Sequence, residues 1–335
     1  MHKIGYYVNN HGTGHTNRLF CFVQELETIG YKYELYVFAE NTDKIFDLGL
    51  PNSNGNAIEV IKLPTPNWKL DKESTIYHCL PINYKEYFGA IVEVCIKESI
   101  QTFVSDLSVE VGHAVRLHVD KLVYVLLHGD RVDSPHTIMF EEADLLLVPF
   151  TSEFEDYYLR NFKERYNLKY SGGFLKFQYQ DSIQSYPAEY LQNKKNVLVI
   201  LGTGGDSFTE EYLDVEDPSY NIVVLGKEVD KYTSIRFTNP YSYLNHADIV
   251  VANAGDSIMH EIAYFDKPYI CIPEDRPFHE QQIKAQQLEK YNYALISNWN
   301  LSLTKDLQRL KPQRNKETLI ENAKAAQYTQ SIINL

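Results

Sequence analysis

Three glycine-rich segments, each directly after an apolar strand-like run, constrain the fold of this chain more than any other feature. They are residues 11–18 after the run 3–8, residues 202–206 after the run 196–201, and residues 253–257 after the run 249–252. Glycine lets the backbone approach a ligand closely, and the N-terminus of a following helix offers unpaired N–H groups to anions. Three such loops, two of them in the second half, predict two nucleotide-binding folds.

Strand-like and helix-like segments alternate along both halves of the chain. Thr16–Ile29 carries apolar residues at helical spacing between the strand-like runs 3–8 and 33–38, which predicts a βαβ unit and a parallel sheet. The predicted fold class is α/β, with two Rossmann-like parallel-sheet domains facing an interdomain cleft. The predicted boundaries are a first domain at 1–165, a linker at 166–195, a second domain at 196–315 and a polar helical tail at 316–335 that packs back on the first domain.

The composition of the chain limits the kinds of partner that we expect it to bind and the compartment that we expect it to occupy. The net charge of −13 disfavours a nucleic acid as the main ligand, because phosphate binding normally needs a basic surface. Of the four cysteines, Cys21, Cys95 and Cys271 lie in apolar segments and are expected in cores, as in a reducing compartment. The sequence shows no signal peptide and no apolar run of about 20 residues, so we expect a cytoplasmic protein. Peripheral contact with the inner face of a membrane stays open.

The first glycine-rich loop does not fit a dinucleotide site. Gly12-x-Gly14 is followed by Asn17 where the dinucleotide fingerprint needs a third glycine. His15 instead begins the helix, where the helix dipole disfavours a charged imidazole. A neutral imidazole can accept a proton near pH 7, which makes His15 a candidate general base. The alternative is a simple turn with surface histidines.

Gly12, Gly14, His15 and Arg18 resemble the Gly-x-Gly-His-x-x-Arg signature of GT-B glycosyltransferases, a group that includes the bacterial enzyme adding N-acetylglucosamine to a lipid-linked cell-wall precursor. Residues 104–111, 114–117 and 123–131 resemble the second half of the acceptor-binding domain of that group. The resemblance implies that Asp106, at a strand end, orients His15 as a catalytic base. The alternative for Asp106 is a helix N-cap.

The same resemblance suggests acceptor contacts in the first domain. The candidates are His11 in the first loop, Glu110, and Arg131 at a later strand end. Arg131 could bind a phosphate of either substrate, or it could make an ordinary salt bridge.

The second half resembles the donor-binding signature of these enzymes. The resemblance covers 253–257, Glu261, Lys267-Pro268, Pro273, Glu280-Gln281 and Ala285. It implies that Gly255 and the helix after it bind the diphosphate, that Glu261 binds the ribose hydroxyls, and that Glu280 and Gln281 bind the transferred sugar. The full set of donor-binding candidates is Gly14, Gly202, Thr203, Gly204, Gly205, Asn253, Ala254, Gly255, Asp256, Ser257, Glu261, Glu280 and Gln281.

Four of these candidates, counting Glu280-Gln281 and the loop 202–206 as one each, have plain structural alternatives. Glu261 could be a solvated or ion-paired helix residue, and Glu280-Gln281 could simply favour a helix start. Asp256 is an acid where the family commonly has a neutral residue, and it either caps the helix or faces the phosphates. The loop 202–206 could be a tight turn, although three glycines in four positions exceed what a turn needs.

The resemblance implies an inverting, metal-independent hexosyltransferase that moves a sugar from a nucleotide diphosphate sugar, expected to be a UDP-sugar, to an acceptor hydroxyl. It implies no cofactor besides this co-substrate, and a role in cell-surface polysaccharide biosynthesis is one expectation. The acceptor stays open among a glycan, a lipid-linked sugar and a small molecule. The rivals are a UDP-sugar 2-epimerase of the same fold, a non-catalytic nucleotide-sugar-binding protein and, in third place, a dehydrogenase.

Overall fold

The chain forms two compact units, which we describe separately. The computed structural model describes residues 1–9, 14–69, 77–78, 80–175, 185–202, 207–236, 240–321 and 325–335. Unit 1 comprises Met1–Ser152, Tyr157–Phe174 and Asn322–Leu335, and unit 2 comprises Glu153–Asp156 and Leu175–Glu321. The predicted boundaries of the linker and tail stay a prediction.

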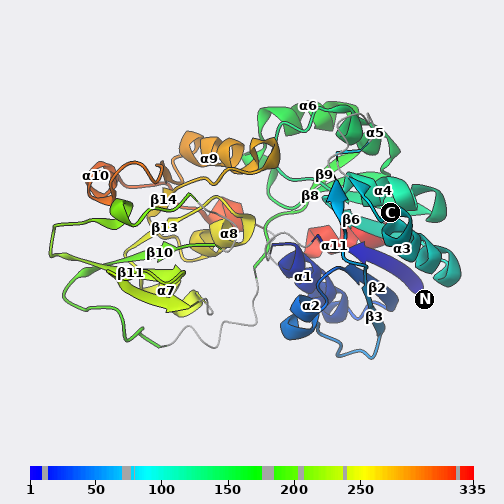
Figure 1. Ribbon diagram of the computed structural model, residues 1–335, viewed down its shortest axis with the longest axis horizontal. Coiled ribbons are helices and arrows are strands. Elements are labelled where there is room, and N and C mark those ends of the chain that lie inside the picture. Colours follow the sequence, from blue (N-terminus) through cyan, green and yellow to red (C-terminus); the bar gives the residue numbers. More distant parts are fainter. Residues whose placement is uncertain are drawn as a thin grey trace. The chain divides into compact units, whose positions relative to one another are not determined.

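Unit 1 is built on a parallel sheet with the strand order β3-β2-β1-β6-β7-β8-β9 (Figure 1). Its strands are β1 (His2–Tyr7), β2 (Tyr33–Ala39), β3 (Ala57–Lys62), β6 (Thr102–Asp106), β7 (Lys121–Val125), β8 (Leu145–Val148) and β9 (Leu168–Tyr170). Its helices are α1 (Gly14–Thr28), α2 (Asp43–Leu48), α3 (Tyr84–Glu98), α4 (Val109–Val115), α5 (Ser134–Glu142), α6 (Tyr157–Arg165) and α11 (Ala326–Ile333). A short antiparallel pair, β4 (Trp68–Lys69) and β5 (Leu80–Pro81), lies outside the sheet.

Two adjacent tyrosines of β1 show how helices cover both faces of this sheet. Successive side chains of a strand point to opposite faces. The hydroxyl of Tyr6 lies 2.9 Å from that of Tyr328 on α11, and the hydroxyl of Tyr7 lies 3.1 Å from that of Tyr87 on α3. All four rings are buried. One face therefore packs on α11 together with α1, and the other face packs on α3.

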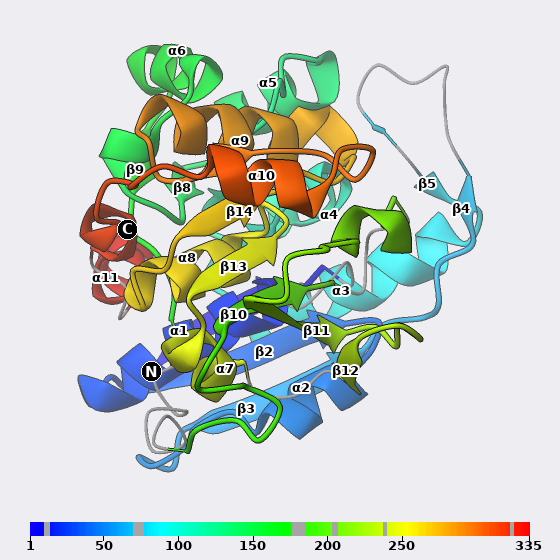
Figure 2. The same cartoon turned by 90° about the vertical axis from the view of Figure 1, so that its left-hand side faces the viewer.

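Unit 2 repeats the same plan. Its sheet has the order β12-β11-β10-β13-β14-β15, again with parallel pairing throughout (Figure 2). The strands are β10 (Lys195–Ile200), β11 (Tyr220–Gly226), β12 (Thr233–Arg236), β13 (Ile249–Ala252), β14 (Tyr269–Cys271) and β15 (Leu295–Ile296). The helices are α7 (Tyr241–His246), α8 (Asp256–Tyr264), α9 (Glu280–Lys290) and α10 (Leu303–Arg309).

Both strand orders reverse direction at one point, between β1 and β6 in unit 1 and between β10 and β13 in unit 2. Ligands of such open sheets bind outside the carboxyl ends of the strands at this reversal. Residues that follow β1 and β6, or β10 and β13, are therefore placed together by the topology alone.

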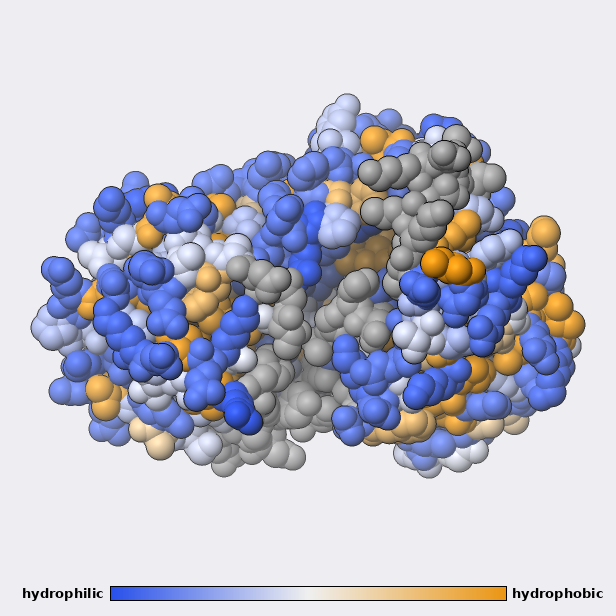
Figure 3. Space-filling model, in the orientation of Figure 1, coloured by the Kyte–Doolittle hydropathy of each residue, from blue (hydrophilic) through white to orange (hydrophobic). Residues whose placement is uncertain are grey.

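The predicted two parallel-sheet units are confirmed, with elements the sequence did not reveal. The strands β9 and β15 are only three and two residues long, too short for a period to show. Cys21, Cys95 and Cys271 are buried, as expected, whereas Cys79 lies outside the described residues. Within the described ranges, no helix is both long and apolar enough to cross a membrane. The face shown in Figure 3 is mostly hydrophilic, with hydrophobic residues in small scattered groups.

Candidate functional site

The first candidate site lies at the reversal point of the unit 1 sheet. His15 is the second residue of α1, which follows β1, and Asp106 is the last residue of β6. The Nδ1 atom of His15 lies 3.0 Å from Oδ1 of Asp106. The Asp106 side chain is fully buried and His15 is 7% exposed. The structure thus brings together the two residues that the sequence proposed as base and orienting acid.

Arg18 is the third member of this cluster, and the sequence analysis gave it no role beyond the signature. Its Nε donates to Oδ2 of Asp106 at 3.1 Å, and its Nη2 donates to Oδ1 at 2.9 Å. Such a fork-to-fork pair fixes the carboxylate in one plane. Because Arg18 follows His15 by three residues, both side chains project from one face of α1 toward Asp106.

These contacts determine the tautomer of His15. Nη2 of Arg18 also lies 2.9 Å from Nδ1 of His15, but Nδ1 cannot accept from arginine while it donates to Asp106. The buried carboxylate is the stronger partner, and Arg18 already bonds it twice, so we assign the ring proton to Nδ1. Nε2 then carries the lone pair that a general base needs.

The ionisation of Asp106 follows from the same neighbours. Burial alone would raise its pKa, but the charges of Arg18 and His15 and their hydrogen bonds outweigh that effect and lower the pKa to about 2. The N-cap alternative for Asp106 is wrong, because Ser108 caps α4 by accepting from the backbone N–H of Val111 at 3.2 Å. Between Asp106 and the cap, Leu107 adopts a left-handed φ of 68°. A non-glycine residue in this region stores strain, which is common at functional sites.

Two other unit 1 candidates, Glu110 and Arg131, contact the histidines His78 and His136. Glu110, on α4, is 8% exposed, and its Oε1 accepts from the backbone N–H of His78 at 3.0 Å. Arg131 is 4% exposed, and its Nη1 lies 3.4 Å from Nε2 of His136. Gly14 begins α1. His11 lies outside the described residues, so its assignment to the acceptor stays a prediction.

The second candidate site lies at the reversal point of the unit 2 sheet. Gly202 follows β10, and Asn253 follows β13. Oδ1 of Asn253 accepts from the backbone N–H of Gly255 at 3.0 Å, which shapes the turn into α8. A Cβ on Gly202 would lie 3.3 Å from Nδ2 of Asn253, and one on Gly255 would lie 3.1 Å from Oδ1 of the same residue. The two glycines therefore let the strand ends pass close to Asn253. Thr203, Gly204 and Gly205 lie outside the described residues.

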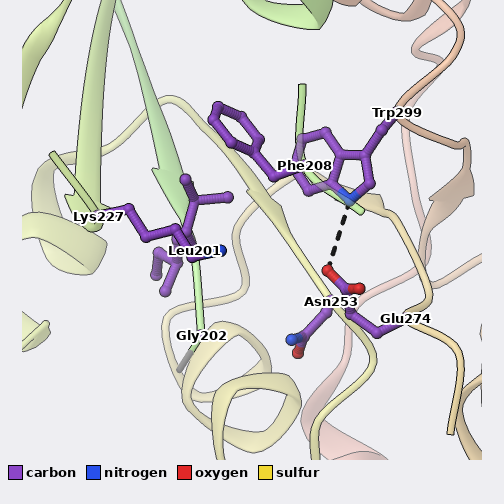
Figure 4. Close-up of a pocket in the computed structure, with 8 residues that line it drawn as sticks. Leu201, Gly202, Phe208, Lys227, Asn253, Glu274 and Trp299 are labelled. Carbon is purple, nitrogen blue, oxygen red and sulfur yellow. Dashed lines mark hydrogen bonds between the residues drawn. The ribbon is translucent and has the colours of Figure 1, made fainter. Parts of the chain in front are cut away.

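A narrow pocket lies at this edge (Figure 4); its empty space of about 220 Å³ includes open solvent, and no part of it is wide enough for a water molecule. Its lining residues are Ile200, Leu201, Gly202, Phe208, Lys227, Asn253, Glu274 and Trp299. Glu274, which the sequence analysis missed, accepts from Oγ of Ser207 at 2.7 Å and from Nε1 of Trp299 at 3.4 Å. Its position just after β14, at the same sheet edge as Asn253, is the signal that could have found it.

The first turn of α8 contains an acidic residue that pairs with a buried lysine. Gly255 stands at the N-cap position, and Asp256 and Ser257 form the first turn. Asp256 is therefore not the N-cap residue of α8. Its carboxylate forms an ion pair, with Oδ1 2.5 Å from Nζ of Lys284 on α9. Lys284 is fully buried and also lies 3.5 Å from Oε1 of Glu280. Burial lowers the pKa of Lys284, but the two carboxylates outweigh burial and raise it, so the lysine stays charged.

Gln281 holds three segments of the site together. Its Oε1 accepts from the backbone N–H groups of Ala254 at 3.2 Å and of Glu274 at 2.9 Å. The carboxamide oxygen is thereby engaged, and only the amide N–H group can serve a sugar hydroxyl. Glu261 is half-buried on α8. Phe278 and His279, just before Glu280, have left-handed φ values of 61° and 50°, a second strained stretch at a candidate site.

Known proteins resemble this chain in sequence or in fold. Residues 172–334 match the glycosyltransferase family 28 C-terminal domain. An uncharacterized glycosyltransferase of Methanosarcina mazei is 23% identical over 349 residues, covering 89% of this chain and 86% of the relative. The crystal structure of MurG from Acinetobacter baumannii superimposes with a TM-score of 0.60 at 14% identity, covering 100% of this chain and 99% of MurG. Arabidopsis thaliana UGT89C1 complexed with UDP-L-rhamnose gives 0.66 at 13% identity, covering 99% and 94%.

The chain is therefore a glycosyltransferase of the GT-B fold. Its second half is a family 28 C-terminal domain.

Proposed function

We propose that the chain transfers a hexose from a UDP-sugar to an acceptor hydroxyl with inversion at the anomeric carbon. The observation that carries the proposal is the buried His15–Asp106 contact of 3.0 Å at the reversal point of the unit 1 sheet. A histidine held this way by a carboxylate can act as a base and is stabilised as imidazolium when it does. Cell-surface polysaccharide synthesis is the role that we propose for the product.

In the proposed reaction, Nε2 of His15 takes the proton of the acceptor hydroxyl. The hydroxyl oxygen forms a bond to the anomeric carbon while the bond from that carbon to the diphosphate oxygen breaks. The nucleoside diphosphate leaves with the bonding electron pair, and His15 later returns its proton to solvent. Asp106 holds the ring and balances its charge, and no step calls on a metal ion. The reaction requires both units to bind parts of one reacting complex.

The unit 2 site supplies the groups that a diphosphate needs. Gly255 and the first turn of α8 offer backbone N–H groups at a helix N-terminus, which favours a negatively charged ligand. The Lys284 ammonium pairs with the Asp256 carboxylate and so reduces the repulsion between Asp256 and the diphosphate. We assign the diphosphate to this turn, the ribose to Glu261, and the sugar to Glu280 and the Gln281 amide. The solved UGT89C1 complexes with UDP-L-rhamnose and with UDP favour uracil as the base.

Measurements of transfer rate and of UDP affinity together test whether His15 is the catalytic base. His15→Ala should lower transfer by about 10²–10⁴-fold, the usual contribution of a positioned base, while UDP affinity measured by calorimetry stays at the wild-type value. His118→Ala, an exposed histidine of the same unit, is the matched control. Full activity of His15→Ala would remove this residue from the mechanism.

Two further measurements separate the rivals. Incubation with donor alone should leave the sugar configuration at C2 unchanged, whereas a 2-epimerase would convert it without an acceptor. A thermal-shift screen of UDP, GDP, TDP and their sugars should give the largest shift with uridine compounds, since binding to the native state raises the melting temperature. Binding without turnover on any acceptor would favour a non-catalytic nucleotide-sugar-binding protein.

A further inference from the structure

A second polar cluster in unit 1 lies apart from the contacts of His15 and takes no part in the proposed transfer. It consists of His78, just before β5, together with Asp133 and His136 at the start of α5. Nε2 of His78 lies 3.0 Å from Nδ1 of His136. Oδ1 of Asp133 lies 3.3 Å from the first nitrogen and 3.1 Å from the second.

These three atoms form a nearly equilateral triangle. A zinc ion with nitrogen and oxygen ligands at about 2.0–2.1 Å in tetrahedral geometry separates its ligand atoms by about 3.3–3.4 Å. The edges of 3.0, 3.1 and 3.3 Å are close to one face of that tetrahedron. A small movement of flexible side chains would therefore complete three ligands around one ion.

No single placement of protons serves all three contacts. If each ring donates to Asp133, Nε2 of His78 to Oδ1 and Nδ1 of His136 to Oδ2, then the 3.0 Å contact between the two nitrogens sets two N–H groups against each other. If one ring donates to the other instead, the accepting nitrogen has no proton for Asp133. A cation between the three groups would bind both nitrogen lone pairs and a carboxylate oxygen at once.

We infer that His78, Asp133 and His136 form a binding site for a divalent transition-metal ion of the zinc class. Two imidazoles and one carboxylate suit Zn²⁺, whereas Mg²⁺ and Ca²⁺ prefer all-oxygen sites. The His78 and Asp133 side chains are 29% and 34% exposed, which gives an ion access and leaves a fourth position for water. The His136 side chain is 1% exposed and anchors the site.

The surrounding contacts hold the ligands in place. The backbone N–H of His78 donates to Glu110, and Oδ1 of Asp133 accepts from the backbone N–H of His136 as the N-cap of α5. Arg131 disfavours metal binding in the present arrangement, because its Nη1 lies 3.4 Å from Nε2 of His136. Metal binding at Nδ1 places the ring proton on Nε2, so the guanidinium must withdraw from that nitrogen. The bound ion would join His78 to the start of α5.

Zinc titration of the untagged, chelator-stripped full chain tests the site. Calorimetry and elemental analysis should find one Zn²⁺ per chain. Asp133→Asn keeps an N-cap residue, and His78→Gln changes a partly exposed side chain, so both variants should fold. Each should weaken Zn²⁺ binding about 100-fold through loss of one of three ligands. His118→Gln is the matched control, because His118 is an exposed histidine of the same unit outside this cluster, and it should leave the affinity unchanged.

Cobalt gives a spectroscopic readout that does not depend on transferase activity. Co²⁺ added to the stripped chain should produce the visible absorption of a four- or five-coordinate site, and both ligand variants should lose it. Absence of Zn²⁺ binding by the wild-type chain would overturn the inference. Equal Zn²⁺ affinity of the wild type, His78→Gln and Asp133→Asn would do the same.

Discussion

Arg18 donates two hydrogen bonds to Asp106, at 3.1 and 2.9 Å, and both side chains are almost completely buried. The carboxylate therefore has two cationic or potentially cationic neighbours, Arg18 permanently and His15 when it is protonated. In the proposed mechanism, Arg18 keeps Asp106 ionised and oriented, and Asp106 keeps the Nδ1 proton of His15 in place. Arg18 is thus a positioning residue that acts through Asp106.

Asp106→Asn should slow transfer strongly without loss of donor binding. The amide is uncharged and can present N–H to His15, so it neither fixes the tautomer nor stabilises the imidazolium. We expect kcat to fall by about 10²–10⁴-fold, with UDP affinity unchanged. Asp144→Asn removes a carboxylate whose Oδ2 lies 3.2 Å from Arg116, and it should leave kcat near the wild-type value. Wild-type kcat in Asp106→Asn would exclude Asp106 from the mechanism.

Acid should destabilise unit 1 through the same carboxylate. The folded-state pKa of Asp106 is about 2, below its ordinary value of 3.8, so the unfolded chain binds this proton more readily. The stabilisation is present above about pH 4 and is lost as the pH falls toward 2; it amounts to about 2 kcal/mol. Urea unfolding between pH 5 and 2 should show a steeper loss for the wild type than for Asp106→Asn. Parallel pH curves would contradict the assignment.

The Asp256–Lys284 pair should behave as a unit. Lys284 is fully buried, and removal of either partner leaves a poorly solvated charge, so Lys284→Met should lower the free energy of unfolding by about 3–5 kcal/mol. The double variant Asp256→Asn, Lys284→Met should recover most of this loss. A double-mutant cycle by urea unfolding measures the coupling between the two side chains. A separate measurement of UDP affinity shows whether loss of the Lys284 ammonium weakens diphosphate binding. Additive losses would show that the pair is not coupled.

The fold, and within the His15 site the residues His15 and Asp106, were predictable from local sequence patterns and the family resemblance. Alternating apolar runs indicated the parallel sheets, whereas the pairing of His15 with Asp106 came from the resemblance to GT-B glycosyltransferases. The observed strand order gives the physical reason for that pairing, because it brings the ends of β1 and β6 together. Arg18 was visible as a signature residue, but its fork onto Asp106 depends on side-chain rotamers that spacing does not determine.

The parts that could not be predicted depend on contacts between distant segments. Lys284 is an ordinary helix lysine in the sequence, and only the packing of α9 against the start of α8 brings its Nζ to Asp256. His78 is separated from His136 by 58 residues, too far for any metal-ligand spacing to appear. Gln281 was expected to contact the sugar, yet its oxygen also joins two backbone segments.

Gly226 should be among the least replaceable residues of unit 2. It ends β11 with a φ of +110°, and a Cβ there would lie 2.1 Å from the backbone oxygen of Leu201, directly before Gly202. Gly226→Ala should therefore destabilise unit 2 and distort the Gly202 turn, and we expect a loss of about 3 kcal/mol or more and weaker UDP binding. Gly30→Ala is the control, because φ is +66° but no atom lies within 4 Å of the added Cβ. It should cost only about 1 kcal/mol. Equal losses in the two variants would show that the Leu201 contact is unimportant.

The C-terminal helix α11 should contribute to the stability of unit 1 through Tyr328. Its ring is fully buried against Phe22 and Phe174, with centroid distances of 6.0 and 5.0 Å, and its hydroxyl meets that of Tyr6. Tyr328→Phe removes only the hydroxyl bond and should cost about 1 kcal/mol, whereas Tyr328→Ala also leaves a cavity and should cost about 3–5 kcal/mol. Tyr157→Ala, at a residue 70% exposed, is the control and should change stability by less than about 0.5 kcal/mol. Urea unfolding of the three variants checks the order. If Tyr328→Ala were as stable as the control, α11 would not be packed on the sheet of unit 1, because loss of a buried aromatic ring from a packed core must be measurable.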